Sequence, residues 1–138
     1  MIKLIEHLPT TTFIISAFIS MEGINVNIIF FCLLFGWLID LDHLIDFIIL
    51  NKKKFNLKLF LSGSYFQKSQ KIYIFLHSYE ITFLLFFSSI LIEQNIFYVA
   101  LAHFFHLIQD QILNKVKYFS YFFMYRLLNN FSIKAVCK

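Results

Sequence analysis

The chain has 138 residues, of which 59% are hydrophobic and only 14% are charged, whereas an ordinary soluble domain carries about 25% charged residues. A soluble core of this size cannot bury 20 Phe side chains together with the Ile and Leu runs, so the composition excludes an ordinary water-soluble enzyme and predicts a membrane protein. The formal net charge of +4 does not point to nucleic acid, because the lysines are not interleaved with a base-reading module.

Four apolar segments follow one another along the chain, and each is long enough for a spanning helix. They cover about residues 5–21, 26–50, 72–92 and 96–113. The first is expected to be a retained helix, because Lys3 is the only basic residue before it and Ser20-Met21-Glu22-Gly23 is a poor cleavage site. We therefore expect an all-α fold, a polytopic membrane helical bundle of about four transmembrane helices that forms a single domain over residues 1–138.

The largest segment outside these spans, residues 51–71, carries a cluster of lysines. In a four-span arrangement, all 12 basic residues fall on the side of this loop, whereas the opposite turns contain Glu22 and Glu93 and no base. Cytoplasmic loops accumulate Lys and Arg. The charge pattern therefore predicts a multi-pass protein of the cell inner membrane with both termini in the cytoplasm.

The tail over residues 118–133 is too polar for a fifth span. Its apolar residues and Arg126 recur at helical spacing, which is typical of a C-terminal amphipathic helix at the interface, either packed on the bundle or sensing lipid. The two cysteines, Cys32 and Cys137, lie far apart without any C-x-x-C spacing, so neither indicates redox or zinc chemistry.

Ionisable residues lie inside the apolar segments or at their cytoplasmic edges, in all four of them. They are Glu6, His7, Asp40, Asp42, His43, Asp46, His77, Glu80, His103, His106 and Asp110. A charged group at the bilayer centre costs at least about 2.5 to 3.5 kcal/mol. Each of these side chains therefore needs an ionic partner, water or a metal.

In the orientation given by the lysines, the ionisable clusters share one depth, in the cytoplasmic half of the bundle. Helical periodicity places His103, His106 and Asp110 on one face of the fourth helix. It also places His77 and Glu80 on one face of the third. The four ionisable residues between 40 and 46 spread over about 160° on a regular helix, so they cannot all point to one centre.

Imidazole and carboxylate groups are ligands for zinc, iron and manganese, and a ligating His commonly needs a carboxylate to orient its other nitrogen. We expect a divalent metal site, with zinc as the expected ion and manganese or iron as alternatives. The candidate ligands are Asp40, Asp42, His43, His77, His103, His106 and Asp110. Because they outnumber the ligands of one zinc, either two metals bind or one metal lies among orienting acids. The alternative is an intramembrane polar network that holds helices together.

The clusters also form a recognisable order. His7 comes first, then Gly36-Trp37-Leu38-Ile39-Asp40-Leu41-Asp42-His43, then His77-Ser78, then His106-Leu107-Ile108-Gln109-Asp110. This order resembles that of the bacterial and archaeal family of membrane-bound metal-dependent hydrolases, whose second motif reads Gly-x-x-Pro-Asp-x-Asp-His. Ile39 stands where the family has Pro, which implies a less sharply broken second helix. Asp46, Glu80 and His103 lie outside the family's pattern.

The resemblance implies hydrolysis, in which a metal lowers the pKa of water toward about 7 and Glu80 or Asp46 accepts the proton. The depth of the site suggests membrane lipids as partners, with the head group of a phospholipid or polyprenyl phosphate as substrate, attracted by the loop lysines. Two alternatives remain. One is a divalent-cation or proton transporter, and the other is a non-catalytic structural membrane protein with a polar helix-packing network.

Overall fold

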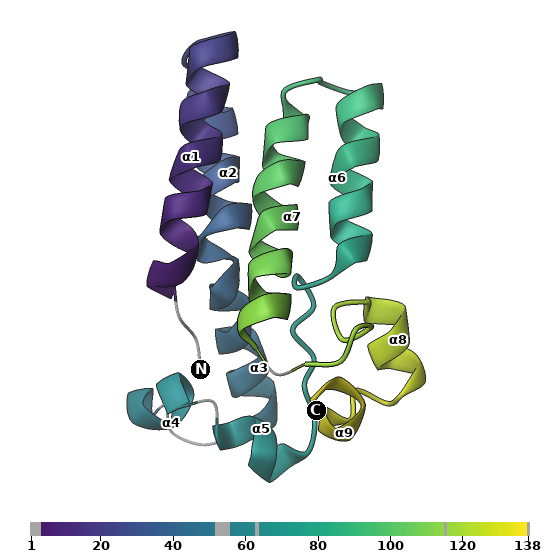
Figure 1. The fold of residues 1–138 in the computed structure, drawn as a ribbon. Helices are drawn as coiled ribbons and strands as arrows, with labels where there is room; N and C mark the ends of the chain where they lie inside the picture. The colour runs from purple at the N-terminus through teal and green to yellow at the C-terminus, as the bar shows by residue number, and fades with distance from the viewer. Residues whose placement is uncertain (1–3, 52–55, 63, 115, 138) are drawn as a thin grey trace.

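The computed structural model describes residues 4–51, 56–62, 64–114 and 116–137, and it is built from helices. Four longer helices lie side by side (Figure 1): α1 (Leu4–Glu22), α2 (Val26–Gly36), α6 (Tyr79–Leu91) and α7 (Ile96–Leu113). Shorter helices gather at the end of this bundle where α1 begins and α7 finishes, which we call the lower end. They are η1 (Leu38–Leu41), α3 (Asp42–Asn51), α4 (Leu57–Ser62), α5 (Ser64–Ser69), α8 (Phe123–Leu128) and α9 (Ile133–Val136).

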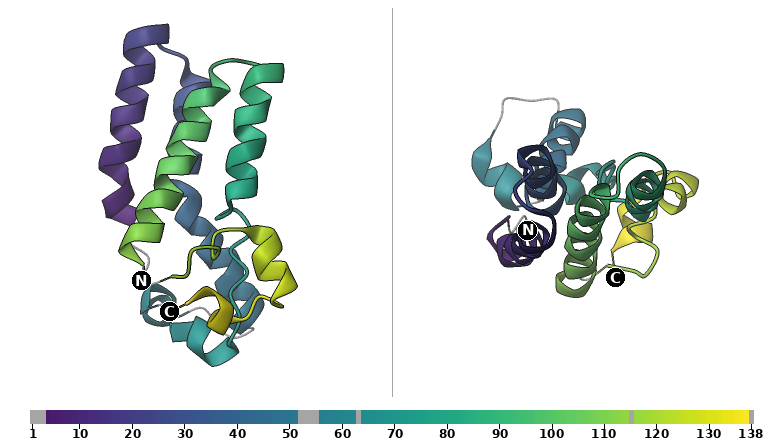
Figure 2. Two further views of the ribbon diagram at one scale, coloured as in Figure 1. Left: turned by 45° about the vertical axis from the view of Figure 1, so that its right-hand side comes forward. Right: turned by 90° about the horizontal axis from the view of Figure 1, so that it is seen from above.

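The long helix α7 is the centre of the bundle, since it packs against α1, α2 and α6 (Figure 2). The upper half of the bundle is held by an apolar cluster that α1, α2 and α7 share. We call it the upper core, and its buried residues are Ile14, Phe18, Ile28, Cys32, Val99 and Ala102. Burial of these apolar surfaces fixes the three helices against one another.

The turn between α1 and α2 follows the punctuation of the sequence. Gly23 has φ +84, a conformation that a residue without Cβ adopts at little cost. Asn25 then caps α2, because its side-chain oxygen accepts from the backbone N–H groups of Asn27 (3.1 Å) and Ile28 (3.3 Å).

The apolar run over residues 26–50 is broken rather than continuous. α2 ends at Gly36, a 3₁₀ turn carries Asp40, and the part from Leu38 onward is bent by 56° relative to α2. The break therefore occurs even though Ile39 replaces a proline. Gly36 is packed so closely that an added Cβ would lie 2.7 Å from the Thr11 hydroxyl oxygen and 2.9 Å from the Ala102 Cβ. At its last residue before the bend, α2 therefore lies in close contact with both α1 and α7.

The prediction of a helix over residues 72–92 is wrong at its beginning. α6 starts only at Tyr79, and residues 72–78 run without regular helix from α5 to α6. The Ile72 N–H donates to the Phe131 carbonyl (3.0 Å), and the Tyr79 N–H donates to the Tyr121 carbonyl (2.9 Å). These pairings with the C-terminal segment replace hydrogen bonds that a helix would have made internally.

The C-terminal segment contains two short helices, α8 and α9, in place of a single amphipathic helix over residues 118–133. Asn130 and Phe131 have φ values of 51 and 55, which turn the chain between the two. Tyr121 and Val136 are buried in a second apolar cluster with Ile72, Ile74 and Leu107. The segment therefore closes the lower end of the bundle by packing.

The basic loop expected over residues 51–71 holds α4 and α5, of which α5 packs on α3. The Tyr65 ring lies 5.1 Å from that of Phe47, and its hydroxyl donates to the His43 carbonyl (3.1 Å). Lys52, Lys53 and Lys54 lie outside the described residues.

Length and apolar composition restrict the number of possible membrane crossings. Within the described ranges, α7 alone meets both requirements as one straight helix, and a second crossing is possible if α2 and the bent segment Leu38–Leu50 count as one span. α6 has 13 residues, a length of about 20 Å against a hydrocarbon thickness of about 30 Å. This criterion gives one or two spans instead of the four predicted.

Candidate metal centre

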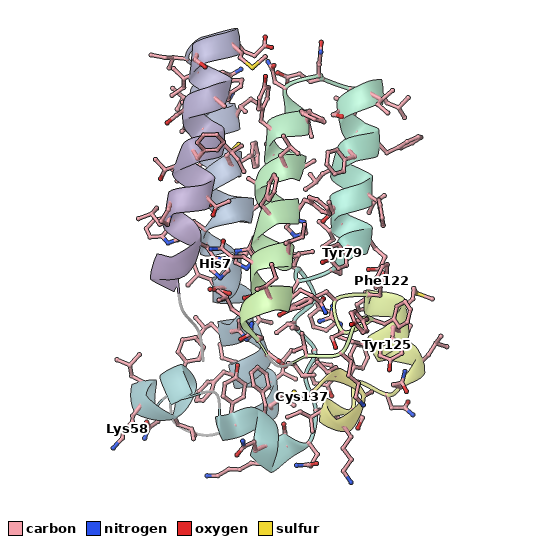
Figure 3. All side chains as sticks on the ribbon, viewed as in Figure 1. His7, Lys58, Tyr79, Phe122, Tyr125 and Cys137 are labelled. Carbon is pink, nitrogen blue, oxygen red and sulfur yellow. The ribbon has the colours of Figure 1, made fainter. Side chains whose placement is uncertain are left out.

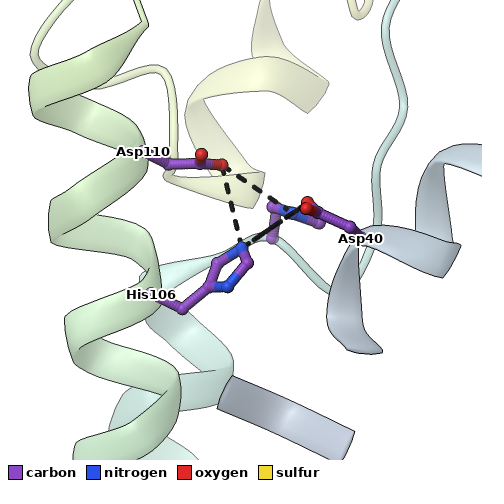
Figure 4. Close-up of side chains that lie close together, drawn as sticks. Asp40, His106 and Asp110 are labelled. Carbon is purple, nitrogen blue, oxygen red and sulfur yellow. Dashed lines mark hydrogen bonds and ion pairs between the residues drawn. The ribbon is translucent and has the colours of Figure 1, made fainter. Parts of the chain in front are cut away.

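Four side chains from three separate parts of the sequence meet at the lower end of the bundle. They are Asp40, His77, His106 and Asp110, and all four are buried. One ligand atom from each lies within 4.8 Å of the others. His77 comes from the segment before α6. Asp40 comes from η1, and His106 and Asp110 come from successive turns of α7 (Figure 4). This group can hold a metal ion.

The centre of the group is the Oδ1 atom of Asp40. It lies 3.2 Å from His77 Nε2 and 3.6 Å from His106 Nε2, and the two Nε2 atoms are 3.3 Å apart. Asp110 contributes its Oδ2, which is 3.9 Å from each of the two Nε2 atoms. Two imidazole nitrogens and two carboxylate oxygens therefore face one point.

The other nitrogen of each imidazole identifies the protonated position. His106 Nδ1 lies 3.2 Å from the Gly36 carbonyl oxygen, which can only accept, so Nδ1 carries the hydrogen. His77 Nδ1 lies 3.5 Å from Asp42 Oδ2, and this carboxylate is also an acceptor. His77 Nε2 also faces a carboxylate oxygen, Asp40 Oδ1 at 3.2 Å, so without a metal this ring can carry a hydrogen on both nitrogens. In the neutral rings with the hydrogen on Nδ1, both Nε2 atoms present a lone pair to the group.

With both rings neutral, four acceptor atoms converge in a buried site, and they repel one another unless a metal cation, or a proton on His77 Nε2, lies between them. Asp40 Oδ2 is in addition buried, and none of the described residues forms a hydrogen bond with it. A buried oxygen in this state costs free energy unless it is paired. Histidines oriented by a carbonyl or carboxylate through Nδ1, and carboxylates beside them, are the usual surroundings of a divalent ion such as zinc. The donor set therefore fits a metal.

Two residues that follow α7 in the sequence, Asn114 and Tyr121, orient the Asp110 carboxylate. The Tyr121 hydroxyl donates to Asp110 Oδ2 (3.1 Å), and the Asn114 side-chain amide donates to Oδ1 (3.0 Å). Burial, followed by the nearby Asp110 carboxylate, raises the pKa of the Tyr121 hydroxyl well above 10. Tyr121 therefore remains protonated and keeps its role as donor to the carboxylate.

His7 borders this group from α1, as its label in Figure 3 shows. Its Nε2 lies 3.4 Å from Asp110 Oδ1, and its ring stacks on that of His106 with centroids 3.9 Å apart. Its Nδ1 is 3.2 Å from Gln109 Oε1, which also accepts from the Thr10 hydroxyl. The side chain of Glu6, the preceding residue, lies outside the described side chains.

Two acids predicted at the site bind backbone instead. Asp42 Oδ2 accepts from the Leu76 N–H (2.7 Å), and Asp46 Oδ2 accepts from the Tyr73 N–H (3.2 Å). Both carboxylates hold the segment that carries His77, and Asp42 also contacts the His77 ring itself. Because the helix breaks before Asp40, that residue points to the group, whereas Asp42 and Asp46 on α3 face the backbone of the segment before α6.

Two further predicted residues, His43 and His103, lie around the group without belonging to it. His43 Nε2 is 3.9 Å from Asp40 Oδ1, and its buried Nδ1 has no hydrogen-bond partner among the described residues. His103 uses both ring nitrogens, one with the Thr82 hydroxyl (2.7 Å) and one with the Leu76 carbonyl (3.1 Å).

Glu80, predicted as a proton acceptor, lies in the first turn of α6, and its carboxylate reaches the start of α8. Its two carboxylate oxygens accept from the backbone N–H groups of Phe123 (2.9 Å) and Met124 (3.0 Å). A carboxylate in this position satisfies free N–H groups of the first helical turn. Its contacts tie α6 to the C-terminal segment.

Sequence reasoning missed two residues of the lower end, Tyr121 and Arg126. Arg126 was expected on the face of an interfacial helix, yet its side chain is fully buried. Burial lowers the pKa of its guanidinium to about 10, while the carboxylates of Asp42 and Glu80 act in the opposite direction, so it stays charged at neutral pH. The sequence did carry a signal for this burial: Arg126 stands among aromatic and apolar residues. A single cation in an apolar segment needs buried polar partners if the segment packs against the bundle.

Comparison of the chain with protein-family models, with curated proteins and with solved structures finds no match. The chemistry of this group of residues is therefore what indicates a function.

Proposed function

We propose that the chain is a membrane-associated metalloprotein that uses one divalent ion, zinc in the first instance, to hydrolyse a lipid-phosphate head group. The observation that carries the proposal is the convergence of the two Nε2 lone pairs with Asp40 Oδ1 and Asp110 Oδ2 within 4.8 Å. The hydrogen bonds of His77 and His106 through Nδ1 support it, because they prepare both rings for coordination. Two nitrogen and two oxygen ligands suit zinc, with manganese or iron as alternatives.

Hydrolysis needs an activated water and a proton acceptor. A bound divalent ion supplies Lewis acidity and lowers the pKa of water toward about 7. Among the chain's own residues we assign proton transfer to His43, since its side chain is 14% exposed, it lies 3.9 Å from Asp40 Oδ1, and its Nδ1 has no hydrogen-bond partner in the described part of the chain. Glu80 is less suited, because both of its oxygens already accept backbone N–H groups. Asp46 is less suited because its Oδ2 accepts the Tyr73 N–H and, unlike His43, it makes no hydrogen bond or ion pair to the four ligand residues in the described part of the chain.

The exposed apolar surface of the bundle supports a lipid substrate. α6 exposes a row of large apolar side chains, of which Phe83 is 62%, Phe87 60% and Ile90 79% exposed. Surfaces of this kind are rare on soluble monomers and require lipid or another protein as cover. A membrane in which α7, and the bent α2–α3 segment, cross at least part of the bilayer would bring the lower end of the bundle to the head-group level.

A transporter of protons or divalent cations would use the same ionisable residues, but it also needs a polar route through the bundle. The buried ionisable side chains of the residues described above all lie at the lower end or in the part of α7 from His103 onward. The upper core beyond them is apolar. This distribution favours a site that is reached from one side.

Metal analysis of the purified protein tests the first part of the proposal. We expect about one zinc, manganese or iron per chain, lost in His106→Ala and in Asp110→Ala and retained in Glu80→Gln, a matched change of a carboxylate outside the group. Equal metal content in the wild type and both ligand variants would refute the metal site.

Activity separates the enzyme from its alternatives. Labelled phospholipid or polyprenyl phosphate in detergent should be hydrolysed by the metal-loaded wild type and at least about a hundredfold more slowly by Asp40→Asn. Metal-dependent ion flux in sealed vesicles without turnover would instead identify a transporter. A metal-bound protein with neither property would be a structural metalloprotein.

A further inference from the structure

The segment that presents His77 to the metal group has no secondary structure of its own. Residues 73–77, which we call the His77 segment, lie between α5 and α6 and are not helical. Ile74 adopts φ +30, which a β-branched residue rarely does. A backbone in such a conformation persists only where the surrounding structure holds it in place.

Buried side chains, rather than a helix or sheet, bind the backbone of this segment. Asp46 accepts from the N–H of Tyr73 and Asp42 from that of Leu76. On the acceptor side, His103 Nε2 lies 3.1 Å from the Leu76 carbonyl oxygen, so that nitrogen is the donor. These three residues come from α3 and α7, the same elements that flank the metal group.

The remaining contacts come from Arg126 on α8. Its Nη1 donates to the carbonyl of Ile74 and its Nη2 to the carbonyl of His77, both at 2.9 Å. The guanidinium is fully buried, and the nearby carboxylates of Asp42 and Glu80 favour its charged form. One rigid fork therefore clamps the strained residue and the metal-ligand residue together.

We infer that Arg126 is a positioning residue for the metal centre, which fixes the backbone of the His77 segment so that His77 Nε2 points at Asp40 and His106. The inference rests on the proposed function, because it assigns Arg126 to the orientation of one of its ligands. The C-terminal segment is by this account a part of the site, although it contributes no ligand.

The contacts of Arg126 explain why its replacement should lower the affinity for the metal. Without the guanidinium, two buried carbonyls lose their donors, and the positive φ of Ile74 loses a constraint. The His77 ring is then free to move relative to the three other ligands. Loss of a group that orients a ligand typically weakens metal affinity by about 10- to 100-fold.

Cobalt binding to the purified full-length protein provides the test, since Co²⁺ reports both affinity and ligand geometry through its visible bands. We expect Arg126→Met to bind Co²⁺ about 10- to 100-fold more weakly than wild type, with altered bands at saturating metal. Arg126→Lys, which keeps a cation and can reach a carbonyl, should recover part of the affinity.

Val136→Ala is the matched control, because Val136 is a buried residue of the same C-terminal segment that packs with Ile72 and Ile74. This variant should lower the unfolding temperature of the apoprotein while leaving the cobalt spectrum and affinity unchanged. An equal loss of affinity in Val136→Ala would overturn the inference, since general loosening of the segment would then suffice.

The other outcomes are equally decisive. Wild-type affinity and spectrum in folded Arg126→Met would overturn the positioning role while leaving the metal site intact. If Arg126→Met yields no folded protein, Arg126→Lys decides, because wild-type binding by this variant would show that the forked geometry is unnecessary. A wild-type protein that binds no cobalt, zinc or manganese would instead refute the proposed function, and with it this inference.

Discussion

The upper core and the metal centre lie in one bundle, but they satisfy their polar groups in different ways. Around Phe18 and Cys32 the backbone is regularly helical, so its hydrogen bonds are internal and the side chains only need to pack. At the lower end the His77 segment leaves the helix, and Asp42 and Arg126 must bind its backbone. The stability of the first region should therefore be independent of metal, whereas that of the second should depend on it.

The largest effect that tests this comparison is in the upper core. Phe18 is completely buried and packs edge-on against Tyr98, with ring centroids 5.0 Å apart. We expect Phe18→Ala to lower the free energy of unfolding by about 3 to 5 kcal/mol, by the same amount with and without a chelator. Denaturant unfolding in detergent measures both values, and a loss that changes with metal would contradict the separation of the two regions.

Metal removal should act on the other region. For a metal present at a hundred times its Kd, chelation is expected to lower the free energy of unfolding by about 2.7 kcal/mol, because the four converging acceptor atoms then lack their cation. His106→Ala should be insensitive to the chelator. The unfolding temperature with and without chelator is the measurement, and identical shifts in both proteins would point to metal bound elsewhere.

A smaller effect is expected where the two regions meet, at Gly36. A Cβ there would lie 2.7 Å from the Thr11 hydroxyl oxygen, and the Gly36 carbonyl orients His106. Gly36→Ala should cost about 1 to 3 kcal/mol by overpacking and should also weaken metal binding. Ser16→Ala, an exposed change on α1, serves as control and should alter stability by no more than about 0.5 kcal/mol. Unchanged metal affinity in Gly36→Ala would show that the two regions are not coupled at this residue.

The smallest predicted effect concerns the orientation of His103. Thr82 donates its hydroxyl hydrogen to His103 Nδ1 if Nε2 is the donor to Leu76, and the Thr82 contact is 2.7 Å long. Thr82→Val removes this partner without changing the shape of the side chain and should cost about 1 kcal/mol. Calorimetry against the exposed Thr12→Val checks the value. Equal stability of the two variants would mean that His103 does not need this hydrogen bond.

The sequence predicted an all-helical chain correctly, because long apolar runs with few Gly and Pro residues favour helices. It also placed Asp40, His77, His106 and Asp110 among a larger set of candidates, since buried ionisable residues need partners wherever they occur. It failed over residues 72–78, where an apolar run was extended into a helix that starts only at Tyr79. It also treated Glu80 as chemically free, although α8 occupies both of its carboxylate oxygens.

By itself, the sequence determined that costly ionisable side chains collect near one end of the helices, because helical rise and apolar length are local properties. Only the tertiary structure decided which of them converge. Asp40 reaches His77 and His106 because the chain bends by 56° after Gly36 and because the His77 segment is held outside any helix. Those two conditions depend on contacts with α1, α7 and the C-terminal segment, which are far apart in the sequence and leave no local pattern.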